Sequence, residues 1–186
     1  MRVLSILCGL LMTLVGCSNN VQSFIVAPEV FWTPSNKLTG MTFALTVQDN
    51  RPSNASLIMR DGDQVRSYPA TNDLVGQLNT TLSDTFKKQG AQVQVSDPVT
   101  MIIQINQLEA NAEINLANHT VRNSVALTLM IEKGTGSFNK SYSANSSFTQ
   151  PLKLDTAMAE RELRILTEQV LGNMLNDASW QDFLRN

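Results

Sequence analysis

VTMIIQINQLEANAEI, residues 99–114, is a long run in which apolar and polar side chains alternate. The apolar positions change face halfway along, first Met101, Ile103 and Ile105 and then Leu108, Ala110, Ala112 and Ile114. Alternation at every second residue predicts a strand with one buried face. Because a slip of one residue would turn the second apolar set toward water, the change of parity near Asn106 and Gln107 predicts a β-bulge.

Further strand patterns flank this run, and no helix pattern separates them. AQVQV at 91–95 precedes the run, and alternating runs follow at 121–131 and 138–148, on either side of a turn at Gly134-Thr135-Gly136. The positions between the apolar ones of the last run are all polar: Ser137, Asn139, Ser141, Ser143, Asn145, Ser147 and Thr149. We therefore expect antiparallel strands that leave one face of the sheet in water.

Upstream, the chain has the pattern of one strand and one hairpin. Phe43, Leu45 and Val47 share one face of a strand, and the strand is expected to stop at the turn-forming residues 49–52. Asp61-Gly62 between two short apolar segments predicts the hairpin.

Two segments have the residue spacing of helices. The first is expected to begin at an N-cap of Thr71 or Asn72, and the second at Asp155 or Thr156. The second runs to about Asn176, and a short amphipathic turn follows it. This order predicts an α+β fold: a two-layer sandwich of a mainly antiparallel sheet, with two longer helices packed on one face and a short C-terminal helix.

The N-terminus has the pattern of a secretory signal peptide. Arg2 precedes 13 residues, 3–15, that are apolar apart from two hydroxyl side chains. As a helix this stretch would cover roughly 20 Å, less than the ~30 Å hydrocarbon core of a bilayer. We therefore predict that residues 1–16 are removed after export.

Leu14-Val15-Gly16-Cys17 follows directly and resembles the bacterial lipobox. The resemblance implies cleavage after Gly16 and acylation of Cys17, which would then be the lipid-bearing N-terminus. Two or more acyl chains hold a protein stably on a membrane, whereas one does not. The alternative is an ordinary signal peptide with a chance cysteine. Ser18, in place of aspartate, resembles the pattern passed on to the outer membrane of Gram-negative cells.

The mature chain divides into a tether and one domain. Residues 17–40 are interpreted as the lipidated N-terminus and tether, and residues 41–186 as a single periplasmic domain. Within the tether, residues 24–32 either pair as an edge strand, which we favour, or lie on lipid headgroups through Trp32.

Composition narrows the classes of function. The 186 residues carry a formal net charge of −2 and 42% of them are hydrophobic, which suits one globular domain. No basic stripe exists for binding nucleic acid. The chain has one histidine, and both cysteines, Cys8 and Cys17, lie in a segment that does not fold with the domain. We therefore expect no metal site and no cofactor.

Few side chains are candidates for catalytic residues. His119 lies at the expected tip of a hairpin and is interpreted as a solvated loop residue. Asp49 and Arg51 either satisfy each other in a tight turn, which we favour, or orient a charged group of a partner. Glu109 and Glu113 share a strand face but are too far apart and too exposed to form a glycosidase pair. We assign no catalytic residue and expect no enzyme.

The C-terminal turn carries an apolar stripe. Trp180, Phe183 and Leu184 are spaced three and four residues apart along one face. The stripe either packs into the domain, which we favour, or contacts a partner.

The chain resembles the YajG family of small bacterial lipoproteins over nearly its whole length. The segments that carry the resemblance are LVGC (14–17), TFALTVQDNR (42–51), VTMIIQINQLEANAEIN (99–115), VRNSVALTLMIEK (121–133), KSYSANSSF (140–148) and LGNMLNDASWQDFL (171–184). The resemblance implies a lipoprotein anchored in the outer membrane and facing the periplasm, with no established reaction. The order of elements is also similar to lipoproteins that serve as accessory subunits of envelope machines.

These observations predict a non-enzymatic lipoprotein that is anchored to the membrane through Cys17. We expect it to bind another envelope protein through a sheet edge, the 106–124 hairpin or the C-terminal stripe. The alternative is a carrier or sensor of a lipid or a cell-wall fragment, held between the helices and the sheet.

Overall fold

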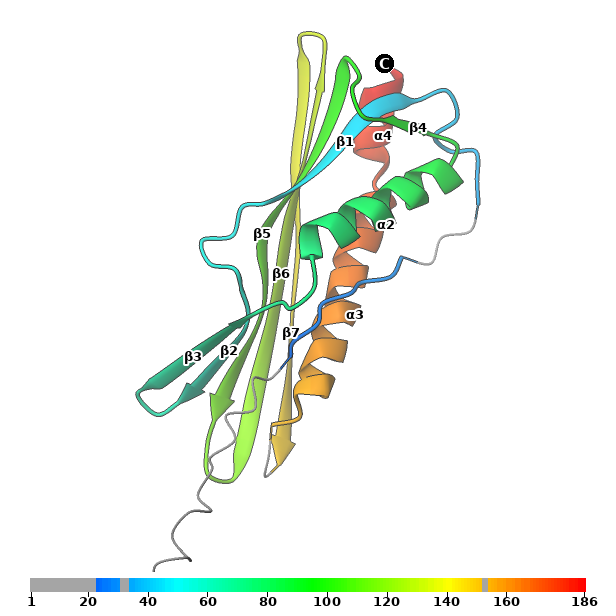
Figure 1. Ribbon diagram of the computed structural model, residues 1–186. Helices are drawn as coiled ribbons and strands as arrows, with labels where there is room; N and C mark the ends of the chain where they lie inside the picture. Colours follow the sequence, from blue (N-terminus) through cyan, green and yellow to red (C-terminus); the bar gives the residue numbers. More distant parts are fainter. Residues whose placement is uncertain (1–22, 31–33, 152–153) are drawn as a thin grey trace, which may run out of the picture.

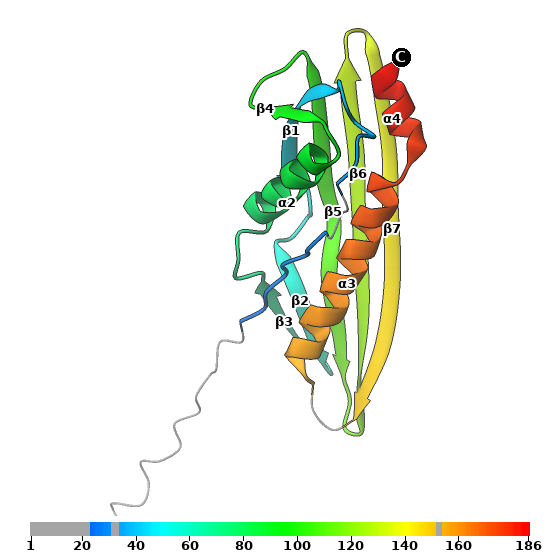
Figure 2. The ribbon, with the colours of Figure 1, turned by 90° about the vertical axis from the view of Figure 1, so that its right-hand side faces the viewer.

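The computed structural model describes residues 23–30, 34–151 and 154–186 (Figure 1). The elements are β1 (Thr42–Asp49), β2 (Ala55–Asp61), β3 (Gln64–Pro69), α2 (Leu74–Lys88), β4 (Gln92–Gln94), β5 (Val99–Ile114), β6 (Asn118–Lys133), β7 (Gly136–Pro151), α3 (Thr156–Leu175) and α4 (Ala178–Arg185). The strands form one curled, seven-stranded sheet, and the helices lie against it (Figure 2). Among the described residues, no helix is long and apolar enough to cross a membrane.

The long strand β5 organises the sheet. One of its edges pairs antiparallel with β6 over its whole length, and β6 pairs antiparallel with β7. Its other edge pairs with β1 as far as Ile105 and with β2 from Ala110 onward. The register shifts between Ile105 and Gln107, which confirms the predicted β-bulge.

The prediction of a mainly antiparallel sandwich with two longer helices on one face is wrong. The sheet is mixed, because the pairs β1–β4, β1–β5 and β2–β5 are all parallel. Nor do the helices form one continuous layer. α2 contacts β1 and β4 at the curled end of the sheet, whereas α3 packs on β5, β6 and β7 (Figures 1 and 2). The two helices therefore cover different parts of a curled sheet.

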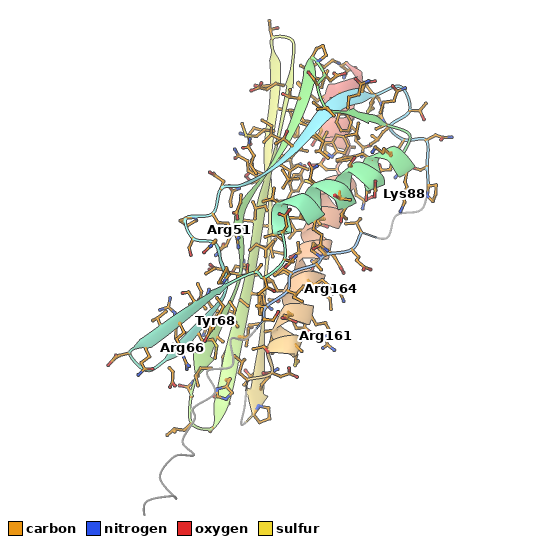
Figure 3. The ribbon with its side chains drawn as sticks, viewed as in Figure 1. Arg51, Arg66, Tyr68, Lys88, Arg161 and Arg164 are labelled. Atoms are coloured by element: carbon orange, nitrogen blue, oxygen red, sulfur yellow. The ribbon has the colours of Figure 1, made fainter. Side chains whose placement is uncertain are left out.

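Arg51 connects β1 and β2 to the middle of β5 (Figure 3). Both strands run parallel to β5 along the same edge, so residues 50–54 bridge a break between them. The guanidinium donates to both carboxylate oxygens of Asp49 at 2.8 Å. Its Nη1 also donates to the carbonyl of Leu108 on β5 at 3.0 Å and to Ser56 Oγ at 3.1 Å. The favoured interpretation, that Asp49 and Arg51 satisfy each other, is confirmed.

The main hydrophobic core lies between the sheet and the helices. Three aromatic rings cross it in edge contacts: Trp180 of α4 meets Phe86 of α2 at 6.0 Å between centroids, and Phe86 meets Phe43 of β1 at 5.4 Å. All three side chains are almost completely buried. On the opposite face, the outward side chains of β7 from Ser137 to Thr149 are exposed. The predicted wet face of this strand is confirmed.

Residues 23–30 form an extended segment, the N-terminal strap, which runs from the start of α2 along α3 (Figure 2). The side chains of Phe24 and Val26 are buried in the core, although this segment was assigned to a tether. Its backbone bonds to residues outside the strands: Ile25 N–H donates to Glu160 Oε1 at 2.8 Å, and the Phe24 carbonyl accepts from Thr71 N–H at 2.9 Å. The edge-strand interpretation is therefore wrong for residues 23–30, and Trp32 lies outside the described residues.

The caps of the helices follow the expected chemistry. Asp155 caps α3 as predicted and accepts from the N–H groups of Ala157 and Met158. α2 is capped by Asp73 rather than by Thr71 or Asn72, because those two residues bind the N-terminal strap. The Asp61-Gly62 hairpin is confirmed as the turn between β2 and β3, where Gly62 has a φ of 57°.

Gln89 at the end of α2 is an internal weakness of the fold. Its side chain is completely buried, and neither its Nε2 nor its Oε1 has a hydrogen-bond partner among the described residues. A buried polar group without a partner costs about 1–3 kcal/mol.

We expect Gln89→Met to raise the free energy of unfolding by about 1–2 kcal/mol, because it removes this desolvation cost at nearly constant volume. Urea unfolding followed by circular dichroism measures the change. Gln181→Met is the matched control, since Gln181 is also buried but its Nε2 donates to the Leu175 carbonyl at 3.1 Å. This control should lower the stability, and a loss in both variants would contradict the prediction.

Candidate functional site

The C-terminal stripe packs largely inside the molecule. Trp180 is completely buried, and its Nε1 donates to the Met174 carbonyl at 2.8 Å. Leu184 is buried as well, whereas Phe183 is half-buried against Phe138 of β7, with 5.9 Å between ring centroids. Trp180 is therefore not part of a contact surface. Phe183 is the half-buried member of the stripe, and its contact with a partner stays a prediction.

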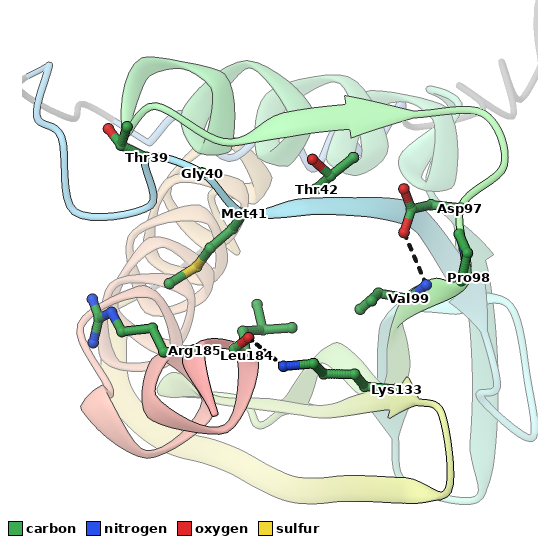
Figure 4. A pocket seen from close by; sticks show the side chains of 10 residues that line it. All are labelled: Thr39, Gly40, Met41, Thr42, Asp97, Pro98, Val99, Lys133, Leu184 and Arg185. Carbon is green, nitrogen blue, oxygen red and sulfur yellow. Dashed lines mark hydrogen bonds between the residues drawn. The ribbon is translucent and has the colours of Figure 1, made fainter.

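One surface pocket, the C-terminal pocket, opens beside α4 (Figure 4). It has a volume of about 650 Å³ and is lined by Met41, Asp97, Lys133, Leu184 and Arg185, among others. Its charged groups are held by the fold. Lys133 Nζ donates to the Leu184 carbonyl at 2.7 Å, Arg185 Nη2 to the Lys37 carbonyl at 3.0 Å, and Asp97 accepts from Val99 N–H at 2.9 Å. These bonds make the pocket a structural joint between α4 and the sheet.

A second hollow, the edge groove, lies between α2 and the free side of β1. Its volume is about 580 Å³. Leu45 and Val47 line it from β1, Val93 and Val95 from the end of β4, and Val75, Asn79 and Lys87 from α2. Five of the eleven described lining residues are thus valine or leucine, and Lys87 carries the one full charge among them. Unlike Lys133 and Arg185, Lys87 makes no ion pair or side-chain hydrogen bond with a described residue.

Asp177, at the junction of α3 and α4, binds three other side chains. Its carboxylate accepts from Lys140 Nζ at 2.6 Å, from Tyr142 Oη at 2.7 Å and from Ser179 Oγ at 2.6 Å. Burial alone would raise the pKa of Asp177, but these hydrogen bonds outweigh it and hold the pKa well below its usual range. Burial, and then the neighbouring carboxylate, raises the pKa of Tyr142. The cluster fastens the N-terminus of α4 to β7.

We expect Asp177→Asn to lower the free energy of unfolding by about 1 kcal/mol at pH 7, because asparagine keeps the helix cap but loses the charged contacts. A depressed pKa stabilises the fold above the unfolded value of 3.8, and this stabilisation is lost as the pH falls below it. The difference in the free energy of unfolding between wild type and variant should therefore shrink steadily as the pH falls below about 4.

Urea titrations at pH 7, 4 and 2.5 test this expectation. Asp182→Asn is the control, since the Asp182 carboxylate pairs with Arg185 at an exposed position. A difference for Asp177→Asn that stays constant at all three pH values would contradict the assignment.

The other candidate side chains are bound within the sheet. His119 is not at a solvated tip: it is the second residue of β6, faces the core side opposite Gln150 and is 6% exposed. Glu109 Oε1 accepts from Gln107 Nε2 and from Asn111 Nδ2, and Glu113 forms an ion pair with Arg122. In the described ranges, no three histidine, cysteine, aspartate or glutamate residues are grouped as a metal site. The lipobox residues Leu14, Val15, Gly16 and Cys17, with Ser18, lie outside the described residues.

Sequence reasoning missed the edge groove and the Asp177 cluster. A weak signal for Asp177 was present, since an aspartate directly before a short amphipathic turn is typical of an N-cap. The groove had no such signal, because it depends on where β4 stops pairing with β1.

Sequence comparisons with known proteins identify uncharacterized lipoproteins as relatives. Residues 28–185 match the model of a family described as uncharacterized lipoprotein. The uncharacterized lipoprotein YajG of Escherichia coli K12 is 24% identical over 181 residues, which cover 94% of this chain and 92% of YajG. YajG of E. coli O6:H1 strain CFT073 matches with the same values.

Among solved structures, protein XCC0632 from Xanthomonas campestris is similar, with a TM-score of 0.53 and 14% sequence identity. The match covers 82% of this chain and 92% of that protein. At this identity the likeness concerns the fold alone.

Proposed function

The chain belongs to the family of uncharacterized lipoproteins that includes YajG, and from this premise we propose that it is a lipid-anchored accessory protein of the cell envelope. In this proposal Cys17 carries the acyl chains and holds the protein on the periplasmic face of the outer membrane. The folded domain has no reaction of its own and binds another envelope protein.

The N-terminal sequence supports the anchoring half of the proposal. An apolar leader ends at Leu14-Val15-Gly16-Cys17, and Ser18 follows the cysteine. The relatives that match are lipoproteins of a Gram-negative bacterium. Ser23 lies against Thr71, with 3.1 Å between their hydroxyl oxygens, so residues 18–22 separate this contact from the acylated residue. Fully extended, the six residue steps from Cys17 to Ser23 span at most about 22 Å, which would keep the domain close to the membrane.

One observation supports partner binding by the domain: the carboxylates of Asp49, Glu109 and Asp177 are hydrogen-bonded within the fold, whereas Lys87 in the edge groove makes no ion pair with a described residue. Asp49, Glu109 and Asp177 each accept at least two hydrogen bonds from neighbouring side chains. A general acid or base needs an accessible proton, and these contacts use the carboxylates for structure. An apolar hollow with one uncommitted charge suits recognition.

The anchor is tested by Cys17→Ser in cells fed radiolabelled palmitate. Wild type is expected to carry the label and to sediment with membranes, whereas the variant loses both properties. Cys8→Ser is the matched control, because Cys8 lies in the leader and should leave labelling unchanged. Label retained in Cys17→Ser, or lost in Cys8→Ser alone, would overturn the assignment of Cys17.

Sorting and partner binding need separate measurements. Ser18→Asp should move the labelled protein from the outer- to the inner-membrane fraction on a sucrose gradient, and an unchanged distribution would count against outer-membrane sorting.

Crosslinking in intact cells should yield a discrete adduct between this protein and a different envelope protein. Recovery of a lone monomer at every crosslinker length would contradict an accessory role.

A further inference from the structure

The free side of β1 is an unfinished sheet edge. β4 pairs with β1 only from Thr42 to Ala44, although β1 continues to Asp49. The Met41 carbonyl accepts from Gln92 N–H on this side, whereas Asn50 N–H donates to the Ile105 carbonyl on the other. Backbone groups alternate in direction along a strand, so Leu45 and Val47 present their N–H and C=O groups to this side. The parallel register Ala44↔Gln94 uses the Leu45 N–H as a donor to the Gln94 carbonyl, whereas the Leu45 carbonyl and both backbone groups of Val47 lie beyond the end of β4. No described strand pairs with them.

α2 forms a wall beside this edge. Val75, Asn79 and Lys87 lie on one stripe of the helix, at helical spacing, and line the edge groove together with Leu45. Val95, just beyond β4, is fully exposed at one end of the groove. The molecule thus combines open backbone hydrogen-bonding groups, apolar side chains on alternate positions and a helix facing them.

We propose that the edge groove binds an extended peptide segment of a partner protein, which adds to β1 as a further strand in line with β4. The segment has aliphatic side chains at alternate positions, which face α2, and a carboxylate near Lys87. Strand addition beside a helix is a general mode of peptide recognition, in which the backbone bonds give affinity and side-chain pockets give specificity. This inference rests on the proposed function and names the chemistry of its partner.

The groove fits a peptide better than an acyl chain. Thr46, Asn79 and Ser83 are polar and line the groove among its valines. A hydrocarbon chain would bury these groups, together with the open carbonyl of Leu45 and the open backbone groups of Val47, without hydrogen bonds, which is costly. A peptide strand satisfies the backbone groups directly. Lys87 then provides an uncommitted cation for an acidic side chain or a terminal carboxylate.

The test uses the full lipidated protein in detergent and a defined probe, the peptide Thr-Val-Thr-Val-Thr-Val-Glu with a fluorophore at its N-terminus. Fluorescence anisotropy measures its binding, and hydrogen exchange measures protection of individual amides. We expect saturable binding with slower exchange at the Val47 amide. Unchanged exchange at the Val47 amide under saturating peptide would overturn the inference.

Reversal of the charge at Lys87 tests whether the acidic end of the peptide lies beside this residue. Lys87→Glu should weaken binding about threefold to fivefold, and a peptide that ends in lysine should recover the loss. Lys88→Glu is the matched control, because Lys88 is adjacent in the helix but does not line the groove. Equal weakening by both variants would show a general charge effect and overturn the assignment of Lys87.

Val47→Pro removes the open N–H of Val47 and should weaken binding at least about fivefold. Asn79→Arg fills the groove from α2 without changing β1, so it keeps the test informative if the proline variant does not fold. Full affinity in Asn79→Arg, or displacement of the peptide by a fatty acid that itself protects the Val47 amide, would overturn a peptide occupant. If the peptide fails while crosslinking in cells still yields a partner, this inference fails alone and the proposed function stands.

Discussion

Arg51→Met is expected to lower the free energy of unfolding by about 2–3 kcal/mol, because it removes several hydrogen bonds made by one buried, charged side chain. The Arg51 side chain is only 6% exposed and donates to Asp49, Ser56 and Leu108 across the break between β1 and β2. Without it, the Asp49 carboxylate, which is 29% exposed, loses its charged partner, and the Leu108 carbonyl on β5 loses its donor. The ordinary tendency of methionine to fill apolar space does not replace these bonds.

Urea unfolding monitored by circular dichroism measures this loss. Arg66→Met on β3 is the control, since Arg66 and Asp61 are 4.0 Å apart and more than half exposed (Figure 3). Such surface changes stay within about 0.5 kcal/mol. Similar losses in the two variants would show that Arg51 does not hold the strands together. The pKa of Asp49, which the hydrogen bond from Arg51 lowers against the opposing effect of desolvation, should return toward its ordinary value in Arg51→Met.

Trp180→Ala has the second large expected effect, a loss of about 3–5 kcal/mol. The indole ring is completely buried between α4 and α2, contacts Phe86 edge-on and donates to the Met174 carbonyl. Alanine would leave a cavity where the three-ring contact now joins α4, α2 and β1. Because Leu184 on the same helix lines the C-terminal pocket, that pocket should open as α4 loosens.

Phe183→Ala is the control for Trp180, since Phe183 is half-buried on the same short helix. Its loss should be about 1–2 kcal/mol, which reflects its partial burial. Hydrogen exchange at the amides of α4 distinguishes local loosening from global unfolding. A Trp180→Ala variant as stable as Phe183→Ala would contradict the role of the aromatic contacts in docking α4.

Local patterns predicted the parts of the fold that depend on one buried face. The alternation in 99–114 needs only the period of a strand, and the bulge follows from its change of parity. The direction of pairing needs more, because β1 and β5 show the same alternation whether they run parallel or antiparallel. Here the hairpin, α2 and β4 return the chain so that β5 starts beside the beginning of β1 and runs in the same direction. This return produces the mixed sheet that the pattern could not reveal.

For the candidate sites too, contacts between neighbours in the sequence could be predicted, whereas features that depend on the path of the whole chain could not. Asp49 and Arg51 are two residues apart, so their contact could be inferred from turn chemistry. His119 was misplaced because Asn118-His119-Thr120 has turn-like composition, while tertiary pairing with β5 and β7 extends β6 past that point. The edge groove exists because β4 has three residues and β1 has eight. The length of pairing is decided by the path of the whole chain.

The N-terminal strap determines how mechanical load would enter this protein. Tension applied ahead of residue 23 would act in succession on three hydrogen bonds of the strap backbone. These join Ile25 N–H to Glu160, Val26 N–H to Asn72 and Glu29 N–H to Glu168. The first and third contacts reach α3, and the second reaches the residue just before the cap of α2. A pull from the membrane is therefore shared between two helices, and the side chains of Phe24 and Val26 must leave the core before the strap can peel away.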